Sequence, residues 1–442
     1  MMSKKKERKF YYIETYGCQM NKYDSELVAS LLQKSGYEET SNYENADLVF
    51  VNTCSVRENA EVRALGRISA LNALRQKKPH LILGVLGCMA ARIGEQILDE
   101  KSYVNLALGP DNYRQIPDLL KKLEQPRDGG QEFATVVSDF ENYENIYPTR
   151  VSGITGWVAI MRGCNNFCAY CIVPYLRGRE RSRSKNNILE EIHQLVADSY
   201  KEVTLLGQNV NSYHDGETDF PDLLLSVARE TGIERVRFAS SHPKDLSARL
   251  IQAIADEPKI CNHIHLAVQA GSNQVLKRMN RRYTREHYLQ LLAQAREKVP
   301  EISFTTDIIV GFPGETEADF EDTLELIRQA QFDNAFTFKY NPRSGTAAAQ
   351  IEDSVSPEEK QRRLEALIEL QNEITLRQNR SHIGQVWPVL VESTSKKSAE
   401  KFRGRTDTNK IVIFPAGNFK IGDIVRVKIN AAEGHTLFGS VE

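Results

Sequence analysis

The first part of the chain alternates between short apolar runs and longer segments in which apolar residues recur with the period of a helix. The short runs predict strands and the longer segments predict helices. The predicted strands are 10–18, 47–54, 81–88 and 103–109, and the predicted helices are 22–35, 58–76, 89–100 and 112–124. Repeated β-α alternation is typical of a doubly wound parallel sheet, so we expect an α/β domain over residues 1–145.

The same alternation resumes after a polar stretch that runs to Arg150, and we place a domain boundary near residue 146. Six strand-like runs follow, with helical segments between them. They are residues 156–162, 202–207, 235–240, 263–269, 302–311 and 334–340. Because eight β-α units close a TIM barrel, six predict an open, partial (β/α)6 barrel, which we expect to cover residues 146–380.

The pattern changes once more near the C-terminus. A helical stripe over residues 356–380 opens with Ser356 as a cap and Pro357 at the first helical position. Short alternating runs separated by Gly and Asn turns then predict strands. These runs are residues 385–392, 410–414, 424–429 and 436–441. They predict a small antiparallel β-barrel over residues 381–442, a fold that commonly binds nucleic acid.

Charge and composition narrow the functional classes only a little. Lys and Arg number 57 against 59 Asp and Glu, so the net charge is −2 and any contact with nucleic acid must come from local basic patches. The sequence shows neither the apolar core of a signal peptide nor an 18-residue apolar run, so we expect a cytoplasmic protein without a membrane partner. Seven cysteines in 442 residues are too few for a disulfide framework. Their placement is therefore more informative than their number.

Three of these cysteines, Cys18, Cys54 and Cys88, each end a predicted strand of the first domain. Parallel strands end at one edge of the sheet, so these N-terminal cysteines should converge in the crevice where α/β folds bind ligands. A buried thiol at a strand end is common, but three in the same structural position argue against coincidence. A structural zinc site would need four ligands at short spacing. A cluster with one open iron fits better.

Three further cysteines, Cys164, Cys168 and Cys171, form the motif C-x3-C-x2-C directly after the first predicted barrel strand. Loops at this edge of a barrel carry chemistry, and thiolates are the usual ligands of iron–sulfur clusters. These central cysteines supply three ligands, so the fourth should be a substrate or cofactor. Zinc is the alternative, but no His or fourth Cys lies close by in sequence. A disulfide is less favoured still.

The central motif, placed after the first strand of a six-unit partial barrel, resembles the radical S-adenosylmethionine superfamily. Y-G-C-Q-M-N, V-N-T-C-S-V-R-E-N-A, the stretch from M-R-G-C to R-E-R-S-R, M-N-R-R-Y-T and T-D-I-I-V-G-F-P-G-E-T resemble, in this order, the methylthiotransferases. S-V-R-E-N-A and the C-terminal G-R-T-D-T-N-K are most similar to the branch that makes 2-methylthio-N6-isopentenyladenosine in tRNA. The likeness covers nearly the whole chain.

This resemblance implies two 4Fe-4S clusters, with S-adenosylmethionine as both radical source and methyl donor. One electron from a small donor protein would enter the cluster on the central cysteines, and the resulting 5′-deoxyadenosyl radical would abstract a hydrogen atom from C2 of an adenine. The cluster on the N-terminal cysteines would hold the sulfur that is methylated and inserted at C2. The sequence does not reveal the sulfur donor or carrier.

Two alternatives stay open. The first is membership of a sister branch of the same family; these branches modify either threonylcarbamoyladenosine in tRNA or an aspartate of a ribosomal protein. A protein of a different class would bind RNA without catalysis and use its metal sites for stability alone. Two sites of three ligands each argue against that second alternative, because a structural metal site is normally closed.

Polar residues at the predicted ends of barrel strands are candidates for contacts with S-adenosylmethionine. They are Gln208, Ser241, Gln269 and Asp307. Ordinary capping or turn hydrogen bonds are the alternative for each. Cys261 stands outside both groups of cysteines, and we expect an inert buried thiol.

Basic residues in two segments are candidates for contact with a tRNA anticodon stem-loop. The first group alternates along the chain and would share one face of an extended segment; it comprises Arg177, Arg179, Arg181 and Arg183. The second group lies in the C-terminal domain, which resembles the RNA-binding TRAM domain of this family; it comprises Lys401, Arg403, Arg405 and Lys410. Solvated charged surface is the alternative for both groups.

Overall fold

The computed structural model describes residues 8–55, 58–124, 130–150, 153–396 and 398–442. The chain forms two compact units. The first, the N-terminal unit, comprises Met1–Ser152 together with Met161–Asn165 and Ile172–Arg183. The second, the C-terminal unit, comprises Gly153–Ile160, Asn166–Cys171 and Ser184–Glu442. Parts of the loop that follows the first barrel strand therefore belong to the N-terminal unit.

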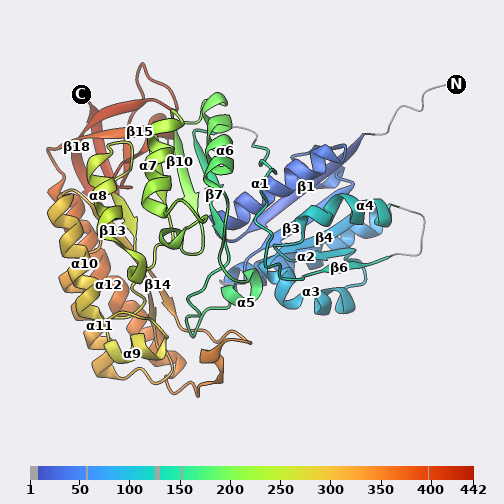
Figure 1. Ribbon diagram of the computed structural model, residues 1–442, viewed down its shortest axis with the longest axis horizontal. Coiled ribbons are helices and arrows are strands. Elements are labelled where there is room, and N and C mark those ends of the chain that lie inside the picture. Colours follow the sequence, from blue (N-terminus) through green and yellow to red (C-terminus); the bar gives the residue numbers. More distant parts are fainter. Residues whose placement is uncertain (1–7, 56–57, 125–129, 151–152, 397) are drawn as a thin grey trace. The chain divides into compact units, whose positions relative to one another are not determined.

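A six-stranded parallel sheet forms the N-terminal unit (Figure 1). In spatial order the strands are β2 (Tyr37–Glu39), β1 (Lys9–Tyr16), β3 (Leu48–Thr53), β4 (Ile82–Gly87), β5 (Leu106–Leu108) and β6 (Glu132–Ala134). All five pairings are parallel, which confirms the predicted α/β fold. Every residue of β3 and β4 is buried, as expected for central strands with both faces covered.

The strand order reverses between β1 and β3, because the chain moves outward to β2 before it returns to β3 on the other side of β1. Such a reversal opens a crevice at the carboxyl ends of the two strands, which is where doubly wound folds bind ligands. In the described part of this unit, four α-helices connect the strands. They are α1 (Gln19–Lys34), α2 (Glu58–Lys77), α3 (Cys88–Glu100) and α4 (Ile116–Leu123).

The C-terminal unit contains the six parallel strands of the predicted partial barrel, and β7, β10, β13 and β14 are labelled in Figure 1. They are β7 (Thr155–Ala159), β10 (Glu202–Leu206), β11 (Arg235–Phe238), β12 (His263–His265), β13 (Ser303–Val310) and β14 (Asn334–Lys339). One sheet has the order β11-β10-β7 and the other β12-β13-β14. Parallel bridges Val236↔Ile260 and Ser241↔Leu266 join the two sheets, so β7 and β14 are the outer edges. The (β/α)6 architecture is confirmed.

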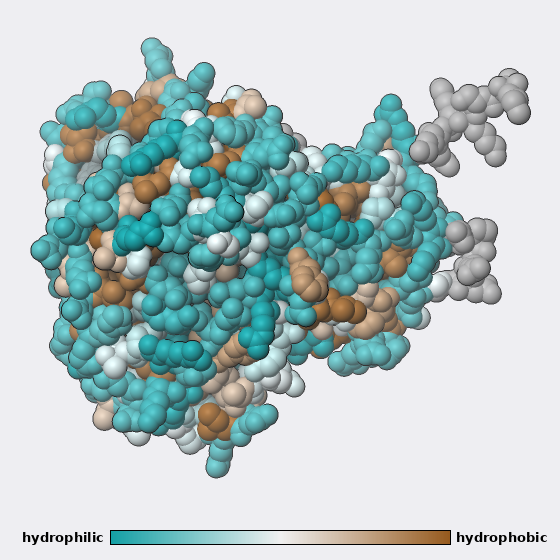
Figure 2. All heavy atoms as spheres, viewed as in Figure 1, coloured by the Kyte–Doolittle hydropathy of each residue, from teal (hydrophilic) through white to brown (hydrophobic). Residues whose placement is uncertain are grey.

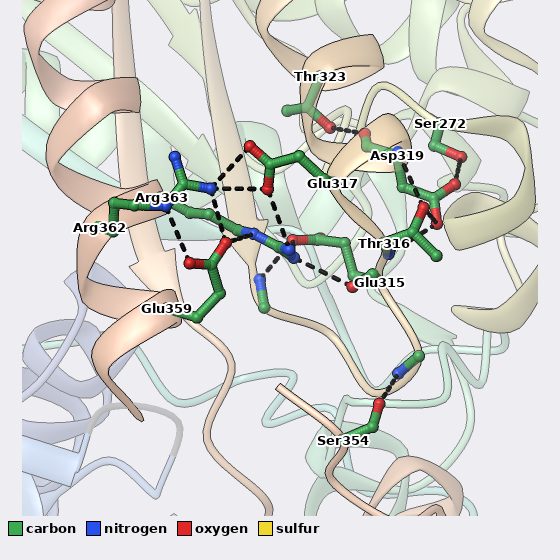
Figure 3. A network of polar contacts seen from close by, with 12 residues as sticks. Ser272, Glu315, Thr316, Glu317, Asp319, Thr323, Ser354, Glu359, Arg362 and Arg363 are labelled. Atoms are coloured by element: carbon green, nitrogen blue, oxygen red, sulfur yellow. Dashed lines mark hydrogen bonds and ion pairs between the residues drawn. The ribbon is translucent and has the colours of Figure 1, made fainter. Parts of the chain in front are cut away.

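Helices cover the outer face of these strands (Figure 1). They are α6 (Lys185–Ala197), α7 (Phe220–Glu230), α8 (Ala248–Asp256), α9 (Asn273–Arg278), α10 (Arg285–Lys298), α11 (Glu317–Ala330) and α12 (Pro357–Ser381). Helix α11 begins with a capping box between Thr316 and Asp319. In the turn before it, buried Glu315 accepts from Arg363 of α12 at 2.8 Å and from the amide of Gly311 at 2.8 Å (Figure 3). The segment G-F-P-G-E-T thus fixes α12 to the end of β13.

The last domain is a closed five-stranded barrel. Its strands, in spatial order, are β15 (Val386–Ser395), β16 (Ser398–Thr406), β17 (Ile411–Pro415), β19 (Thr436–Val441) and β18 (Ile424–Glu433). All neighbours are antiparallel except β17 and β19. Val389, Val412 and Val427 are among the completely buried side chains of its core. The small barrel is confirmed, although β16 was not among the predicted strands.

The turn between β16 and β17 lies against the amino-terminal ends of the partial-barrel strands. Arg237 of β11 donates to the carbonyl oxygens of Thr406 at 2.6 Å and Asp407 at 2.8 Å. The Ser303 hydroxyl, at the start of β13, donates to the carbonyl oxygen of Thr408 at 2.7 Å. These hydrogen bonds hold the turn of the small barrel against β11 and the start of β13. The small barrel therefore covers the amino-terminal end of the partial barrel.

Hydrophilic residues cover most of the face shown in Figure 2, and hydrophobic residues are scattered among them. Within the described part of the chain, no helix combines the length and apolar character needed to cross a lipid bilayer.

Candidate functional site

The N-terminal cysteines lie where three neighbouring strands end. Cys18 follows β1 and caps α1, Cys54 follows β3, and Cys88 is the first residue of α3 directly after β4. The strands β1, β3 and β4 are adjacent in the sheet, as the sequence predicted. Gly87 permits the last of these turns, because its φ of +88° and its approach to the Thr53 carbonyl leave no room for a Cβ atom.

The thiols of this group influence one another. A hydrogen bond involving Cys54 lowers the pKa of Cys18 to about 6; burial opposes this change and the charge of Arg177 supports it. Burial raises the pKa of Cys88, whereas the same arginine acts in the opposite direction. Two of the three cysteines also stand at helix N-termini, where backbone amides favour anions. Arg177 and the helix N-termini thus favour the thiolate form, whereas burial of Cys88 opposes it.

A buried arginine supports this group. The Nε atom of Arg177, at the end of α5 (Val173–Arg177), donates to the Cys88 sulfur at 3.2 Å. Its Nη2 atom donates to Asp24 Oδ2 at 2.8 Å, and Arg162 Nη2 donates to Asp24 Oδ1 at 2.6 Å. Arg162 also lies over the Tyr143 ring, 4.5 Å from its centroid. All of these residues belong to the N-terminal unit.

Several buried polar atoms of the N-terminal unit, on residues next to Cys54 in sequence or in the neighbourhood of Asp24 and Arg177, have no hydrogen-bond partner in the described residues. They are Thr53 Oγ1, Tyr113 Oη, Arg162 Nε and Nη1, and Arg177 Nη1. Unpaired buried donors are costly, so they point to an acceptor group that fills this space. An iron–sulfur cluster on the three thiols would supply sulfur acceptors and negative charge, and the residues present fit it.

Across the described ranges, no three His, Cys, Asp or Glu side chains are gathered tightly enough for a single metal ion. An iron–sulfur cluster makes a different demand, because each thiolate binds a different iron atom and the sulfur ligands stand apart.

The central cysteines follow β7 in a loop shared by the two units. In the N-terminal unit, the amide of Cys164 donates to the Gly178 carbonyl at 3.1 Å. Gly163 before it has a φ of +77°, and a Cβ atom there would stand 1.9 Å from the Arg179 carbonyl oxygen, so only glycine fits. In the C-terminal unit, the amide of Cys171 donates to the Cys168 carbonyl at 2.9 Å.

Cys168 has its own buried arginine. Arg281 Nη1 donates to the Cys168 sulfur at 3.3 Å. Its Nε atom donates to Tyr283 Oη at 2.8 Å and its Nη2 atom to the Ala267 carbonyl oxygen at 2.6 Å. Burial raises the pKa of Tyr283 to about 12, so that hydroxyl is neutral. A positive charge beside Cys168 fits a thiolate that binds iron.

Three of the predicted cofactor contacts, Gln208, Ser241 and Gln269, follow the carboxyl ends of β10, β11 and β12, whereas Asp307 lies within β13. Gln208 Oε1 and Ser241 Oγ are buried atoms without a partner in the described residues, which is consistent with polar groups that await a ligand. Gln269 has a φ of +72° and donates its amide to the carbonyl oxygen of Asp307 at 2.8 Å. The Asp307 carboxylate lies 3.3 Å from His265 Nε2. These contacts with S-adenosylmethionine stay a prediction.

Burial of three of the four alternating arginines corrects the expectation of a phosphate-binding face. Arg177, Arg181 and Arg183 are only 3%, 8% and 1% exposed. Arg181 pairs with Asp111 at 2.9 Å, and Arg183 donates to Tyr23 Oη at 3.0 Å. These side chains are inaccessible to a phosphate in this structure. Arg179 alone is exposed.

Burial of Lys410 gives a similar correction in the C-terminal barrel. Lys410 is 8% exposed and pairs with Asp333 at 2.5 Å. Arg403 and Arg405 are half-buried and both pair with Glu392, and their contact with RNA stays a prediction. Lys401 is exposed and keeps its predicted role as a candidate for RNA contact.

Sequence reasoning missed the residues that support the cysteines. They are Asp24, Arg162 and Arg281. A local signal existed for two of them, because Arg162 precedes Cys164 by two positions and Arg281 lies in M-N-R-R-Y-T. Asp24 carries no such signal; it lies within an ordinary helical segment.

A polar cavity of about 340 Å³ lies within the C-terminal unit, and none of its lining residues is a cysteine. Ser303, Asp333, Thr408 and Lys410 are among its lining residues, so it sits at the closed amino-terminal end of the partial barrel. It is part of the junction with the small barrel.

Family models match three parts of the chain. The family described as "Radical SAM superfamily" matches residues 158–327. "Uncharacterized protein family UPF0004" matches residues 10–109, and "TRAM domain" matches residues 380–441. The fold also resembles that of a radical S-adenosylmethionine methyltransferase, TsrM from Kitasatospora setae, with a TM-score of 0.59, 14% identity and coverage of 77% of each chain. The family match over residues 158–327, which includes the central cysteines, defines the class: a radical S-adenosylmethionine protein.

Curated relatives narrow the class further. The tRNA-2-methylthio-N(6)-dimethylallyladenosine synthase of Parabacteroides distasonis is 49% identical over 440 residues, which cover 98% of this chain and 95% of the relative. The synthase of Carboxydothermus hydrogenoformans is 48% identical over 436 residues, which cover 98% of this chain and 99% of that relative. The chain belongs to this family of radical S-adenosylmethionine methylthiotransferases. Membership implies a 4Fe-4S cluster and S-adenosylmethionine as cofactors and tRNA as the class of substrate.

Proposed function

We propose that this enzyme inserts and methylates a sulfur at C2 of N6-isopentenyladenosine next to the anticodon of tRNA, which gives 2-methylthio-N6-isopentenyladenosine. The observation that carries the proposal is identity of 47–49% over 98% of the chain to several synthases named for this product. The TRAM domain match supports an RNA substrate.

The central cysteines would hold the cluster that binds S-adenosylmethionine, and the N-terminal cysteines a second 4Fe-4S cluster. When bound, these groups would supply an electron, a radical that can remove an unreactive C–H hydrogen, and the sulfur that takes the place of that hydrogen. Arg281 beside Cys168 and Arg177 beside Cys88 support this assignment, since each donates to a cysteine sulfur.

The protein's own groups bind and orient the reactants. Gln208 and Ser241 offer buried polar atoms for S-adenosylmethionine, while Gln269 follows β12 and Asp307 lies on β13. Arg179 and Lys401 are exposed and suited to contact tRNA phosphates. A small electron-donor protein would deliver the reducing electron.

The test uses the anaerobically reconstituted protein with dithionite, S-adenosylmethionine and an isopentenylated anticodon stem-loop. Mass spectrometry follows 5′-deoxyadenosine and the modified nucleoside. We expect both products from the wild type. Cys54→Ala should still form 5′-deoxyadenosine but give no methylthio product, whereas Cys168→Ala should form neither.

The methylthio nucleoside and 5′-deoxyadenosine test different parts of the proposal. An unchanged yield of methylthio product from Cys54→Ala would remove the second cluster from the reaction. If 5′-deoxyadenosine forms in the wild type but the isopentenylated RNA stays unmodified, the substrate belongs to a sister branch. The same assay with RNA that contains threonylcarbamoyladenosine, and with the ribosomal protein, then identifies which sister branch the enzyme belongs to.

A further inference from the structure

Arg177 is a buried charged group of the N-terminal unit whose hydrogen bonds are only partly satisfied. The backbone places it at the end of α5, only six positions after Cys171, yet its side chain is 4% exposed. One nitrogen donates to the Cys88 sulfur, a second to Asp24, and the third, Nη1, has no partner among the described residues. A guanidinium that is buried and only partly satisfied requires an acceptor.

Charge balance leads to the same requirement. Arg162 and Arg177 share the single carboxylate of Asp24, and the exposed fractions of these three side chains are 1%, 4% and 0%. The neighbouring Arg181 is already balanced by Asp111. Within the described residues, one positive charge of the group therefore has no carboxylate of its own. Burying an unpaired charge costs several kcal/mol, so an anion should lie beside these residues when the protein is complete.

The adjacent N-terminal cysteines identify the kind of anion. Three thiolates and a 4Fe-4S cluster together carry net negative charge, which increases by one on reduction. Hydrogen bonds to the sulfurs and local charge are known determinants of cluster potential. A guanidinium that donates to a cluster thiolate should favour the reduced form, because that form carries more negative charge.

We propose that Arg177 is a positioning residue of the N-terminal cluster: it donates to the Cys88 thiolate and stabilises the reduced cluster, while Asp24 and Arg162 fix its orientation. This rests on the proposed function, which places a cluster on Cys18, Cys54 and Cys88. Two simpler roles compete with it. Arg177 could serve only as a buried ion-pair partner of Asp24, or it could contact tRNA phosphate, which its burial disfavours.

The experiment isolates the N-terminal cluster. In a background in which Cys164, Cys168 and Cys171 are all changed to Ala, the full chain is reconstituted with iron and sulfide. Iron content and a redox titration followed by electron paramagnetic resonance are then measured for Arg177→Gln, Arg177→Lys and the matched control Arg179→Gln. Arg179 lies two positions away in the same segment but is exposed.

We expect the background to bind about four iron atoms per chain, the content of one such cluster. Arg177→Gln should shift the midpoint potential to more negative values, Arg177→Lys should shift it less because the charge is kept, and Arg179→Gln should leave it unchanged. Loss of iron from a folded Arg177→Gln protein, restored in Arg177→Lys, would also support the proposal.

An unchanged potential and iron content in Arg177→Gln would overturn it, as would an equal shift in Arg179→Gln. If Arg177→Gln does not fold, Arg177→Lys decides: a shifted potential supports the role and an unshifted one refutes it. A background that binds no iron would instead refute the second cluster, and hence that part of the proposed function, before Arg177 is tested.

Discussion

Two cysteines in different parts of the molecule each accept a hydrogen bond from a buried arginine, but the two arginines are held in different ways. Arg177 donates to Cys88 at 3.2 Å and shares the carboxylate of Asp24 with a second arginine. Arg281 donates to Cys168 at 3.3 Å, and its other acceptors are neutral, a tyrosine hydroxyl and a backbone carbonyl. Within the described residues, no carboxylate forms an ion pair with Arg281.

Both arrangements leave one buried positive charge uncompensated. At the N-terminal cysteines, two arginines face one aspartate; at Cys168, Arg281 stands without a carboxylate. An anionic iron–sulfur cluster would supply the missing charge in both places. The difference is that a carboxylate orients the first arginine, whereas neutral hydrogen-bond acceptors orient the second. Removing a carboxylate should therefore disturb only one site.

Cys261 shows that an arginine near a buried thiol is not by itself a mark of a cluster. The positive charge of Arg237 acts to lower the pKa of the Cys261 thiol. Each nitrogen of this guanidinium, however, already donates a hydrogen bond to another acceptor. Nε binds Glu202 at 2.8 Å, and the two Nη atoms bind the carbonyl oxygens of Thr406 and Asp407. Here the guanidinium is paired and satisfied, and the arginine joins two domains instead of awaiting a ligand.

The largest effect is expected from Asp24→Asn. It leaves Arg162 and Arg177 facing each other in the protein interior, which should destabilise the N-terminal unit by roughly 3–5 kcal/mol. Native-state hydrogen exchange in α1 measures this loss as the free energy of opening. Asp118→Asn is the matched control, because that carboxylate is 79% exposed in its pair with Lys121. It should cost at most about 0.5 kcal/mol.

The same variant predicts a pH dependence. Burial alone would raise the pKa of Asp24, but the charges of Arg162 and Arg177 outweigh it and hold the pKa below its ordinary 3.8. The stability from the ionised carboxylate is thus present above about pH 4 and is lost as the pH falls through the lower folded-state value. The difference between wild type and Asp24→Asn should stay constant from neutral pH to about pH 5 and shrink only below about pH 4. If the difference in unfolding free energy between wild type and Asp24→Asn vanishes near neutral pH, the pKa of Asp24 is not held low by the two arginines.

Much of the fold was predictable because periodicity is a local property of the sequence. All six strands of the partial barrel and four strands of the N-terminal sheet were predicted close to their observed positions. The strands that were missed are short or charged. β2 and β6 have three residues each at the sheet edges, and β16 contains E-K-F-R-G-R, whose pairing with β15 and β17 has no local signature.

The site was predictable only in part, for a related reason. Cysteines at strand ends can be read from the pattern, but ion pairs between distant positions cannot. Arg177 and Asp24 are 153 positions apart, and Arg181 and Asp111 are 70 apart. From sequence, the alternating arginines looked like an exposed face, whereas the fold buries three of them against partners from other elements. Lys410 was misjudged in the same way, because Asp333 lies 77 positions away.

A smaller effect is expected from Arg281→Gln, which removes the charge and one hydrogen bond beside Cys168. Groups that support a metal ligand typically change metal affinity or activity by about 10- to 100-fold. We therefore expect 5′-deoxyadenosine formation to fall by that factor, with partial recovery in Arg281→Lys. Asp24→Asn, compared at a temperature at which it remains folded, should leave this rate unchanged. Equal losses in the two variants would mean that the two cysteine sites are not independently supported.

The smallest effect is expected from Cys261→Ala. Burial raises the pKa of this thiol to about 11, so it is neutral at physiological pH and a poor metal ligand. Losing its buried sulfur should cost about 1 kcal/mol, and both iron content and 5′-deoxyadenosine formation should match the wild type. Cys88→Ala is the comparison: it is equally buried, at 3% exposure, but should lower the iron content. If Cys261→Ala also loses iron, a balanced arginine no longer separates structural thiols from ligands, and the charge argument for Arg177 and Arg281 loses its basis.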